Sequence, residues 1–452
     1  MSMSARARGS WWARRARSRP ARLVETTSRA FMRTEGLSSA LLLLATTLAL
    51  LWANSPSRAG YDVLRELVCQ VQLGPIGFGT TLRDAVNDGL MTIFFLVIGL
   101  EIKHELVAGE LSGIRHAALP AAAALGGMAA PALIFAALNW GGDGLRGWAI
   151  PTATDIAFAL GALASVRGGA GSSRRVFLLA LAIVDDLGAI VIIALFYGHG
   201  FAFGPLIASA GFLALFALVA RAGLNAPITA ILAAAGAWAC FLGSGLHPTL
   251  AGVALGLLVP TQAWTPLKRF AAVANRLIAL VERARAQGRT TRAEALLGWL
   301  ETWTVGTEPP LDRLQRSLHG WSSFLVLPLF AFLNAGVAID GNALSYALQS
   351  RVGWGVALGL LVGKPVGVWV GTRLAERLGL AARSEVSEPR NLLGVGMLTG
   401  VGFTVALFVT GLAFADDPQN AAAAKIAILA ASLVSSIAGV AILSTGRRRS
   451  HA

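Results

Sequence analysis

The sequence predicts an all-α polytopic membrane protein, because its 452 residues are 55% hydrophobic and only 14% charged. Soluble domains carry about 25% charged residues, so a water-exposed protein of this composition would lack the charge to cover its surface. Abundant Leu, Val, Ile and Phe exclude a disordered chain, and glycine without a Gly-X-Y period excludes collagen. Two cysteines are too few for a disulfide scaffold or a cysteine-based zinc site.

Twelve apolar segments approach the length of about 20 residues that a helix needs to cross the hydrocarbon core. We therefore expect about 12 transmembrane helices, near residues 38–54, 86–102, 116–138, 148–165, 176–197, 203–220, 225–242, 246–260, 320–339, 352–371, 391–414 and 421–443. If the N-terminus is cytoplasmic, most of the 38 Lys and Arg residues fall in the inner connections and the two tails. The positive-inside rule favours this threading, with both termini in the cytoplasm.

The charge pattern divides the chain into five parts. They are an Arg-rich cytoplasmic tail expected to be disordered (1–36), spans 1–8 (37–260), a basic cytoplasmic linker (261–319), spans 9–12 (320–443) and a second basic tail (444–452). Basic clusters that flank spans favour contact with anionic lipid headgroups, and they argue against nucleic acid as a partner. A transit peptide or a twin-arginine signal at Arg14-Arg15 is the alternative for the first part, but no small-residue cleavage site follows it.

The linker 261–319 can form one or two amphipathic helices. A separate functional domain is the alternative, but the segment contains neither a glycine-rich phosphate loop nor a cluster of metal ligands. The sequence therefore favours a solvated connection between two groups of helices.

Six charged side chains stand out within the predicted spans. A charge at membrane depth costs at least a few kcal/mol, so each is a functional candidate. Asp88 and Glu101 lie near span ends, where nearby water offers a structural explanation instead. The six residues are Asp88, Glu101, Asp155, Asp185, Asp186 and Lys364.

The fourth span contains the sequence Pro151-Thr152-Ala153-Thr154-Asp155. Proline removes a backbone donor, so we expect the helix to break here, and irregular backbone at membrane depth survives only beside protein or water. The freed carbonyls and the Thr152 and Thr154 hydroxyls are suitable ligands for a small cation. An ordinary proline kink without a site is the alternative.

Asp185 and Asp186 stand next to each other in the fifth span. On a helix their side chains diverge by about 100°, so they can face one polar funnel but cannot share one ligand symmetrically. Such a pair can hold protons or a metal cation, but hardly both together. This competition is the basis of ion exchange.

Lys364 is the one cation deep in a predicted span, and Pro365 follows it. The next span contains a glycine-rich run from Gly394 to Thr404, which is a poor continuous helix. Interrupted helices in spans 4 and 11 indicate a transporter built from inverted-topology repeats, with its binding site where the breaks meet.

These motifs resemble the NhaA family of sodium/proton antiporters, itself an example of the inverted-repeat design. The similar stretches occur in order and cover most of the chain outside the tails, the first outer loop and residues 261–313. They are NDGLMTIFFLVIGLEIKHEL, WAIPTATDIAFALGALA, LALAIVDDLGAIVIIALFY, SGLHPTLAGVALGLLVP, LPLFAFLNAGV, LVGKPVGVWVG and GMLTGVGFTVALFVTGLAF.

The resemblance implies twelve helices, with spans 3–5 and 10–12 as inverted repeats and broken helices 4 and 11 crossing at mid-membrane. It implies a non-enzymatic transporter of the bacterial plasma (inner) membrane that needs no cofactor and expels Na⁺ or Li⁺ while more than one proton enters. A homodimer is compatible with it, formed through the outer loop 55–87. The implied roles are binding of protons and of Na⁺ or Li⁺ at Asp185 and Asp186, with Asp155 and Thr154 at the helix crossing, charge compensation by Lys364 and Asp155, and a cytoplasmic funnel of Asp88 and Glu101 with Glu105 at its mouth.

The chain departs from the family in the stretch that precedes the ninth span. That stretch usually carries an acid and histidines for pH sensing, but here Gln315 and Arg316 replace them and only His319 remains. His247 matches its motif, although a lone histidine near a helix start is more often structural. We expect Asp88, Glu101, Glu105, His247 and His319 to shape the pH response.

Other classes of membrane protein fit the motifs less well. A proton-coupled carrier for an organic solute should show aromatic and hydrogen-bonding groups around a larger cavity. An intramembrane aspartyl protease needs aspartates on two different helices, one of them in a Gly-x-Gly-Asp setting that this sequence lacks. A cation channel has no need of a titratable pair beside a buried lysine.

Overall fold

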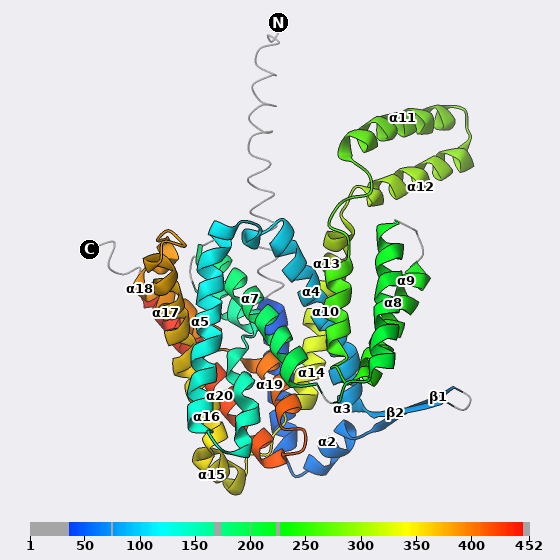
Figure 1. Ribbon diagram of the computed structural model, residues 1–452. Helices are drawn as coiled ribbons and strands as arrows, with labels where there is room; N and C mark the ends of the chain where they lie inside the picture. Colours follow the sequence, from blue (N-terminus) through cyan, green and yellow to red (C-terminus); the bar gives the residue numbers. More distant parts are fainter. Residues whose placement is uncertain (1–35, 74–75, 167–172, 199, 223–226, 446–452) are drawn as a thin grey trace, which may run out of the picture. The chain divides into compact units, whose positions relative to one another are not determined.

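The computed structural model describes residues 36–73, 76–166, 173–198, 200–222 and 227–445. The predicted Arg-rich tail and most of the second basic tail lie outside these residues. The described chain is almost entirely helical and forms two compact units, which are described separately (Figure 1). The all-α prediction is confirmed.

Unit 1 comprises the described parts of residues 1–54, 122–182 and 335–452. Its elements are the helix Gly36–Ala53, most of α5 (Ile114–Leu138), η3 (Asp143–Thr152), α6 (Ile156–Ala164), the first part of α7 (Ser173–Phe196), α15 (Gly341–Gln349), α16 (Arg351–Leu358), η5 (Gly359–Gly363), α17 (Lys364–Arg377), η6 (Glu385–Ser387), α18 (Pro389–Thr399), α19 (Phe403–Ala413) and α20 (Pro418–Ser444).

Unit 2 comprises the described parts of residues 55–121 and 183–334. Its elements are α2 (Arg58–Arg65), β1 (Val68–Leu73), β2 (Ile76–Thr81), α3 (Leu82–Asp84), η1 (Ala85–Leu90), α4 (Met91–Val107), η2 (Glu110–Ser112), the start of α5, the rest of α7, α8 (Phe203–Arg221), α9 (Pro227–Ser244), α10 (Thr249–Leu258), α11 (Leu267–Ala286), α12 (Thr290–Gly306), α13 (Pro310–Trp321), η4 (Ser322–Val326) and α14 (Leu327–Ala335).

A helix or a bent helix pair occupies each of the twelve predicted span positions. Among the described residues, nine helices are long and apolar enough to cross a membrane, and two bent pairs raise this number to eleven if each is one span. The remaining candidate, α10, has only ten residues. The structure supports a multi-pass protein, while the count of twelve stays a prediction.

The two bent pairs lie where the sequence predicts interruptions. η3 and α6 meet at 42°, and α18 and α19 meet at 46°, each across a break of a few residues. Ala153 and Asp155 have extended backbone in the first break, directly after Pro151 and Thr152. Gly400 and Gly402 occupy the second break. The geometry fits either a broken span or a re-entrant segment.

Proline explains two of the π-helical segments. η5 ends directly before Lys364-Pro365, and η4 ends shortly before Pro328. A proline inside a helix cannot donate to the carbonyl one turn earlier, and a local π turn accommodates the displaced backbone.

Close backbone contacts fix the helix pairs around the charged groups. In unit 1, a Cβ atom on Gly367 of α17 would lie 2.1 Å from the Gly126 carbonyl oxygen of α5. In unit 2, a Cβ atom on Gly252 of α10 would lie 2.2 Å from the Thr92 carbonyl oxygen of α4. Only glycine permits approaches of this kind, which are a common basis of helix association in membranes.

Two features go beyond the sequence prediction. β1 and β2 form an antiparallel hairpin, paired from Val68 with Thr81 to Leu73 with Ile76, in the predicted first outer loop. The ninth predicted span begins ten residues earlier than expected, because α13 starts at Pro310 and continues through η4 into α14. Proline suits the first position of a helix, where its missing N–H is not needed.

Candidate functional site

Asp155 joins the two bent helix pairs of unit 1. Its backbone N–H donates to the Val401 carbonyl oxygen at 2.7 Å, which connects one break to the other. Its side chain caps α6, because Oδ1 accepts the Phe158 N–H at 3.0 Å. Oδ2 accepts the N–H of Thr404 at 3.1 Å and its hydroxyl at 2.5 Å. The buried carboxylate therefore lies at the N-terminal ends of both α6 and α19, where the helix dipoles favour negative charge.

Lys364 lies in the same unit and is fully buried. Its ammonium Nζ donates to Thr154 Oγ1 at 2.9 Å, and the Thr154 hydroxyl donates to the Thr399 carbonyl oxygen at 2.9 Å. Thr399 is the last residue of α18, so the cation lies beside a helix C-terminus, where positive charge is favoured. The structure thus brings Lys364 to Thr154, the residue that precedes Asp155.

Asp185 and Asp186 lie in unit 2, in α7, which is one continuous α-helix. Both are buried: Asp185 is 0% and Asp186 4% exposed. Burying two adjacent carboxylates requires that each be neutralised by a proton, a cation or a hydrogen-bonded partner. Within the described residues, no three His, Cys, Asp or Glu side chains gather as metal-ion ligands.

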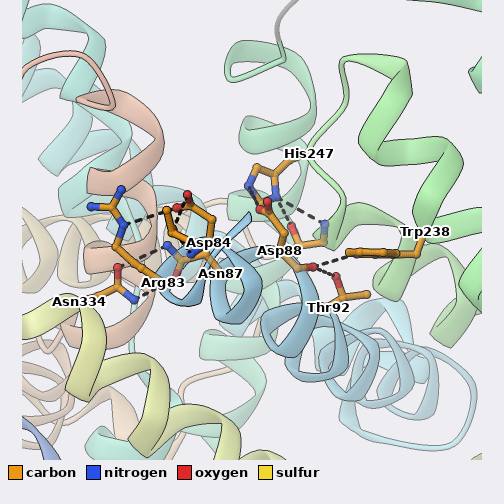
Figure 2. A network of polar contacts seen from close by, with 10 residues as sticks. Arg83, Asp84, Asn87, Asp88, Thr92, Trp238, His247 and Asn334 are labelled. Carbon is orange, nitrogen blue, oxygen red and sulfur yellow. Dashed lines mark hydrogen bonds and ion pairs between the residues drawn. The ribbon is translucent and has the colours of Figure 1, made fainter. Parts of the chain in front are cut away.

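Asp88 lies in η1, at the start of the helix that continues as α4. Its Oδ1 atom is 3.6 Å from His247 Nε2, and the other ring nitrogen of His247 is 2.8 Å from Thr249 Oγ1. The backbone carbonyl of Asp88 accepts the indole N–H of Trp238 at 2.9 Å and the Thr92 hydroxyl at 2.5 Å. Figure 2 shows Trp238 of α9 and His247, in the turn that precedes α10, converging on Asp88. A π turn re-aims the backbone carbonyl in this way and often marks a functional position.

A second pair of contacts lies beside that cluster. Asn87 and Asn334 exchange side-chain hydrogen bonds, at 2.8 Å in the better direction (Figure 2). They connect η1 to the end of α14. The start of this span is therefore held by polar contacts from several elements of unit 2.

Glu101 lies thirteen residues further along the same helix, or about 20 Å by helical rise. Asp88 and Glu101 are therefore well separated along the span, and their expected place along one cytoplasmic funnel stays a prediction. Glu101 accepts a side-chain hydrogen bond from Gln315 of α13. Nearby, His104 Nδ1 is 3.3 Å from Asp312 Oδ1, which is a second contact between α4 and α13.

Two further charged side chains, Lys103 and Glu105, lie near the end of α4. Lys103 Nζ donates to the carbonyl oxygens of Leu257 and Val259, at 2.7 and 2.5 Å, and so caps the end of α10. Glu105 accepts the Glu110 N–H at 2.9 Å. The half-buried His319 lies in the last turn of α13.

Known proteins resemble this chain along most of its length. A family profile described as Na⁺/H⁺ antiporter 1 matches residues 29–443. An Na⁺/H⁺ antiporter NhaA 2 from Sorangium cellulosum is 42% identical over 417 residues, covering 91% of this chain and 88% of that protein. The chain belongs to the NhaA family of Na⁺/H⁺ antiporters. NhaA 1 from Myxococcus xanthus is 41% identical over 92% of each chain, and NhaA from Christiangramia forsetii is 37% identical over 93% and 94%.

Membership of the NhaA family confirms the resemblance predicted from the motifs. It makes this a multi-pass membrane transporter of a family whose substrates are Na⁺ and H⁺. Sequence reasoning missed Thr399 and Thr404, whose partners lie about 245 residues away in the chain. It also did not predict that Trp238 binds Asp88 or that Gln315 binds Glu101. Nothing in the local sequence distinguishes these two side chains from others of their type.

Proposed function

We propose that this NhaA-family protein is an electrogenic antiporter that expels Na⁺, and also Li⁺, in exchange for protons at Asp185 and Asp186. The burial of two adjacent carboxylates in one helix carries the proposal. Two carboxylates can release two protons and then bind one monovalent cation. Each cycle would then move net charge across the membrane, in the bacterial plasma membrane with both termini in the cytoplasm.

Thr154, Asp155 and Lys364 would make the broken helices tolerable at membrane depth. Helix ends expose partial charges, positive at the N-termini and negative at the C-termini. Asp155 at the starts of α6 and α19, and Lys364 beside the end of α18, are placed to compensate them. Thr154 would share this role, because its hydroxyl connects Lys364 to the end of α18.

The remaining groups would set the pH response from two separate places. Asp88 and His247 belong to the polar cluster at the start of the span, while Glu101, Glu105 and His319 lie toward its other end. By the charge asymmetry of the connections, the second group is cytoplasmic. Anionic lipids and a second copy of the chain are the expected partners, and residues 261–319 would connect spans 1–8 to spans 9–12.

Purified protein in proteoliposomes tests the exchange directly. With an internal pH dye, added Na⁺ or Li⁺ should drive proton movement, and K⁺ should not. Clamping the membrane potential with valinomycin and K⁺ should change the rate, because net charge moves. Exchange that ignores the potential would exclude the electrogenic mechanism, and no response to any cation would exclude antiport. Neither the organic-solute carrier nor the aspartyl protease is favoured, since the relatives are named antiporters.

A further inference from the structure

The segment between α10 and α13 is a helical hairpin with its own small core. α11 and α12 run antiparallel (Figure 1) and pack through Val281, Ala284 and Ala293, with Leu296 against them. The Thr265 N–H donates to the Gly306 carbonyl oxygen at 2.9 Å and closes the base of the hairpin. A segment with a core and a closed base is a structured element, in keeping with the one or two amphipathic helices that the sequence allows.

Charge is distributed unevenly around this hairpin. Residues 267–306 contain seven Lys and Arg but only three Glu. Arg269, Arg276 and Arg283 of α11 are spaced by seven residues, which is two helical turns, so they form one exposed stripe beside the packed face. The same spacing places Arg292 and the 66% exposed Trp299 on one stripe of α12.

The two stripes lie on the same side of the hairpin. On each helix, the stripe lies about a quarter of a turn before the face that packs through Val281, Ala284 and Ala293. Because the two helices are antiparallel, these two flanks point to the same side of the hairpin. The three glutamates fall on the opposite side by the same construction. They are Glu282, Glu294 and Glu301, all exposed. The basic face thus consists of Arg269, Arg276, Arg283, Arg292 and Trp299, and it contains no acid.

Short connections attach the hairpin to the apolar helix α10 at one end and to a candidate membrane span at the other. Three residues separate α12 from α13, which begins a candidate span at Pro310. The Leu311 N–H donates to the Pro260 carbonyl oxygen at 3.2 Å, and the Arg313 guanidinium lies 5.8 Å from the Trp264 ring centre. The hairpin is therefore anchored close to the bilayer surface, where charged headgroups are at high local concentration.

We infer that the basic face of the α11–α12 hairpin docks on anionic phospholipid headgroups of the bilayer that holds the protein. Arginine binds phosphate through its planar fork of donors, and tryptophan favours the interface between headgroups and hydrocarbon. Several arginines on one acid-free face attract an anionic surface, and salt screens the attraction. Lipid contact at this face does not depend on which cation the protein exchanges.

A nitroxide spin label on the basic face tests the docking. Ala295 lies between Arg292 and Trp299 on their stripe, so Ala295→Cys is labelled in a full-length Cys69→Ser, Cys240→Ser background. The protein is placed in nanodiscs of phosphatidylcholine, with or without about one third phosphatidylglycerol, and collisions with a water-soluble nickel chelate are measured. We expect about threefold fewer collisions in the anionic discs, and recovery at about 0.5 M NaCl.

Two triple variants remove equal charge from different sides. Arg269→Gln, Arg276→Gln and Arg283→Gln should abolish the protection. Lys268→Gln, Arg285→Gln and Arg289→Gln lie outside the basic face and should preserve it. Equal collision rates of the labelled parent in the two kinds of disc would overturn the inference, as would protection that survives the first triple variant. Because all six residues are exposed, neither variant should unfold the hairpin.

Discussion

Thr404 donates both its backbone N–H and its hydroxyl to the same carboxylate oxygen of Asp155, across 249 residues of sequence. The two residues belong to different bent helix pairs, so the contact ties the break after η3 to the start of α19. Because the carboxylate also caps α6, one buried group fixes the starts of two helices. Much of the architecture around the breaks therefore depends on one side chain.

Removing the Thr404 hydroxyl should destabilise unit 1. A hydrogen bond to a charged group contributes about 1.5–3 kcal/mol, so Thr404→Val should lower the melting temperature in detergent by several degrees. Thr404→Ser keeps the hydroxyl and should lose much less. Thr410→Val is the matched control, because Thr410 is equally buried on α19 but bonds only the Ala406 carbonyl. Equal losses for Thr404→Val and Thr410→Val would contradict this account of Asp155.

Asp186→Asn should abolish Na⁺-driven exchange. The substitution removes a negative ligand of the cation and a titratable proton in one step. Asp185→Asn retains the Asp186 carboxylate, so we expect residual exchange with altered coupling between protons and Na⁺. Dye-loaded proteoliposomes measure both variants, with reconstituted amounts matched by immunoblot. Robust exchange by Asp186→Asn would exclude the assigned roles.

A side chain at Gly252 should disrupt the contact between α4 and α10. Because its Cβ would lie 2.2 Å from the Thr92 carbonyl oxygen, Gly252→Ala forces the two backbones apart. Overpacking of this kind costs about 1–3 kcal/mol, seen as a lower melting temperature. Gly211→Ala on α8 is the control, since a Cβ atom there would have no neighbour within 4 Å, and it should be neutral or slightly stabilising. A neutral Gly252→Ala would show that the helices are not held by this contact.

The pH response should change little when one of the usual sensor residues is restored. Arg316→His returns a histidine to the stretch before the ninth span and leaves Gln315, the donor to Glu101, in place. We expect Asp88, Glu101 and the aspartate pair to set most of the profile, so the midpoint of exchange activity between roughly pH 6.5 and 9 should move by less than about half a unit. A larger movement would assign the response to the restored histidine.

The ion pair at the start of α13 should contribute only above acidic pH. Arg316 Nη2 lies 2.6 Å from a Glu308 carboxylate oxygen, and this contact holds the pKa of Glu308 below its usual value of 4.5. A depressed carboxyl pKa stabilises the folded state at neutral pH, and the contribution disappears as the pH falls through the lowered value. Because Arg316 is exposed and Glu308 is only half-buried, Glu308→Gln should lower the melting temperature by less than about 2 °C at pH 7. Thermal melts from about pH 7 down to pH 3.5 should show this gap closing, and a gap that widens in acid would contradict it.

The sequence predicts well those features that depend on local composition. Spans follow from apolar runs, and the two breaks follow from Pro151 and from the glycines around Gly400, because these residues act on the backbone where they stand. The β-hairpin at Val68–Thr81 was not predicted, although polar or glycine residues alternate with apolar ones in Gln70–Leu73 and Ile76–Gly79. Its strands are too short and too poor in apolar residues to form an apolar run of the length that predicts a span. The extra turns of α13 were missed because their polar face resembles a solvated linker.

Contacts between distant residues set the limit for the candidate site. A charged residue within an apolar run is easily recognised in the sequence, and Asp155 and Lys364 were found in this way. Their partners Thr404 and Thr154 differ little from other threonines in helices, so only the folded chain identifies the first as a donor to Asp155. The shared funnel of Asp88 and Glu101 stays a prediction, because no described contact joins the two residues.

The glycine contact between α4 and α10 has a mechanical consequence. At Thr92 and Gly252 the two backbones are in direct contact, without a side chain of Gly252 between them. A sliding movement of one helix along the other would therefore be opposed by backbone contacts. Lys103 fastens the far end by holding the last carbonyls of α10. Because these contacts hold the two helices at separate points along α4, we expect the pair to move as one body, with Asp88 near one end of the span and Glu101 about 20 Å along it.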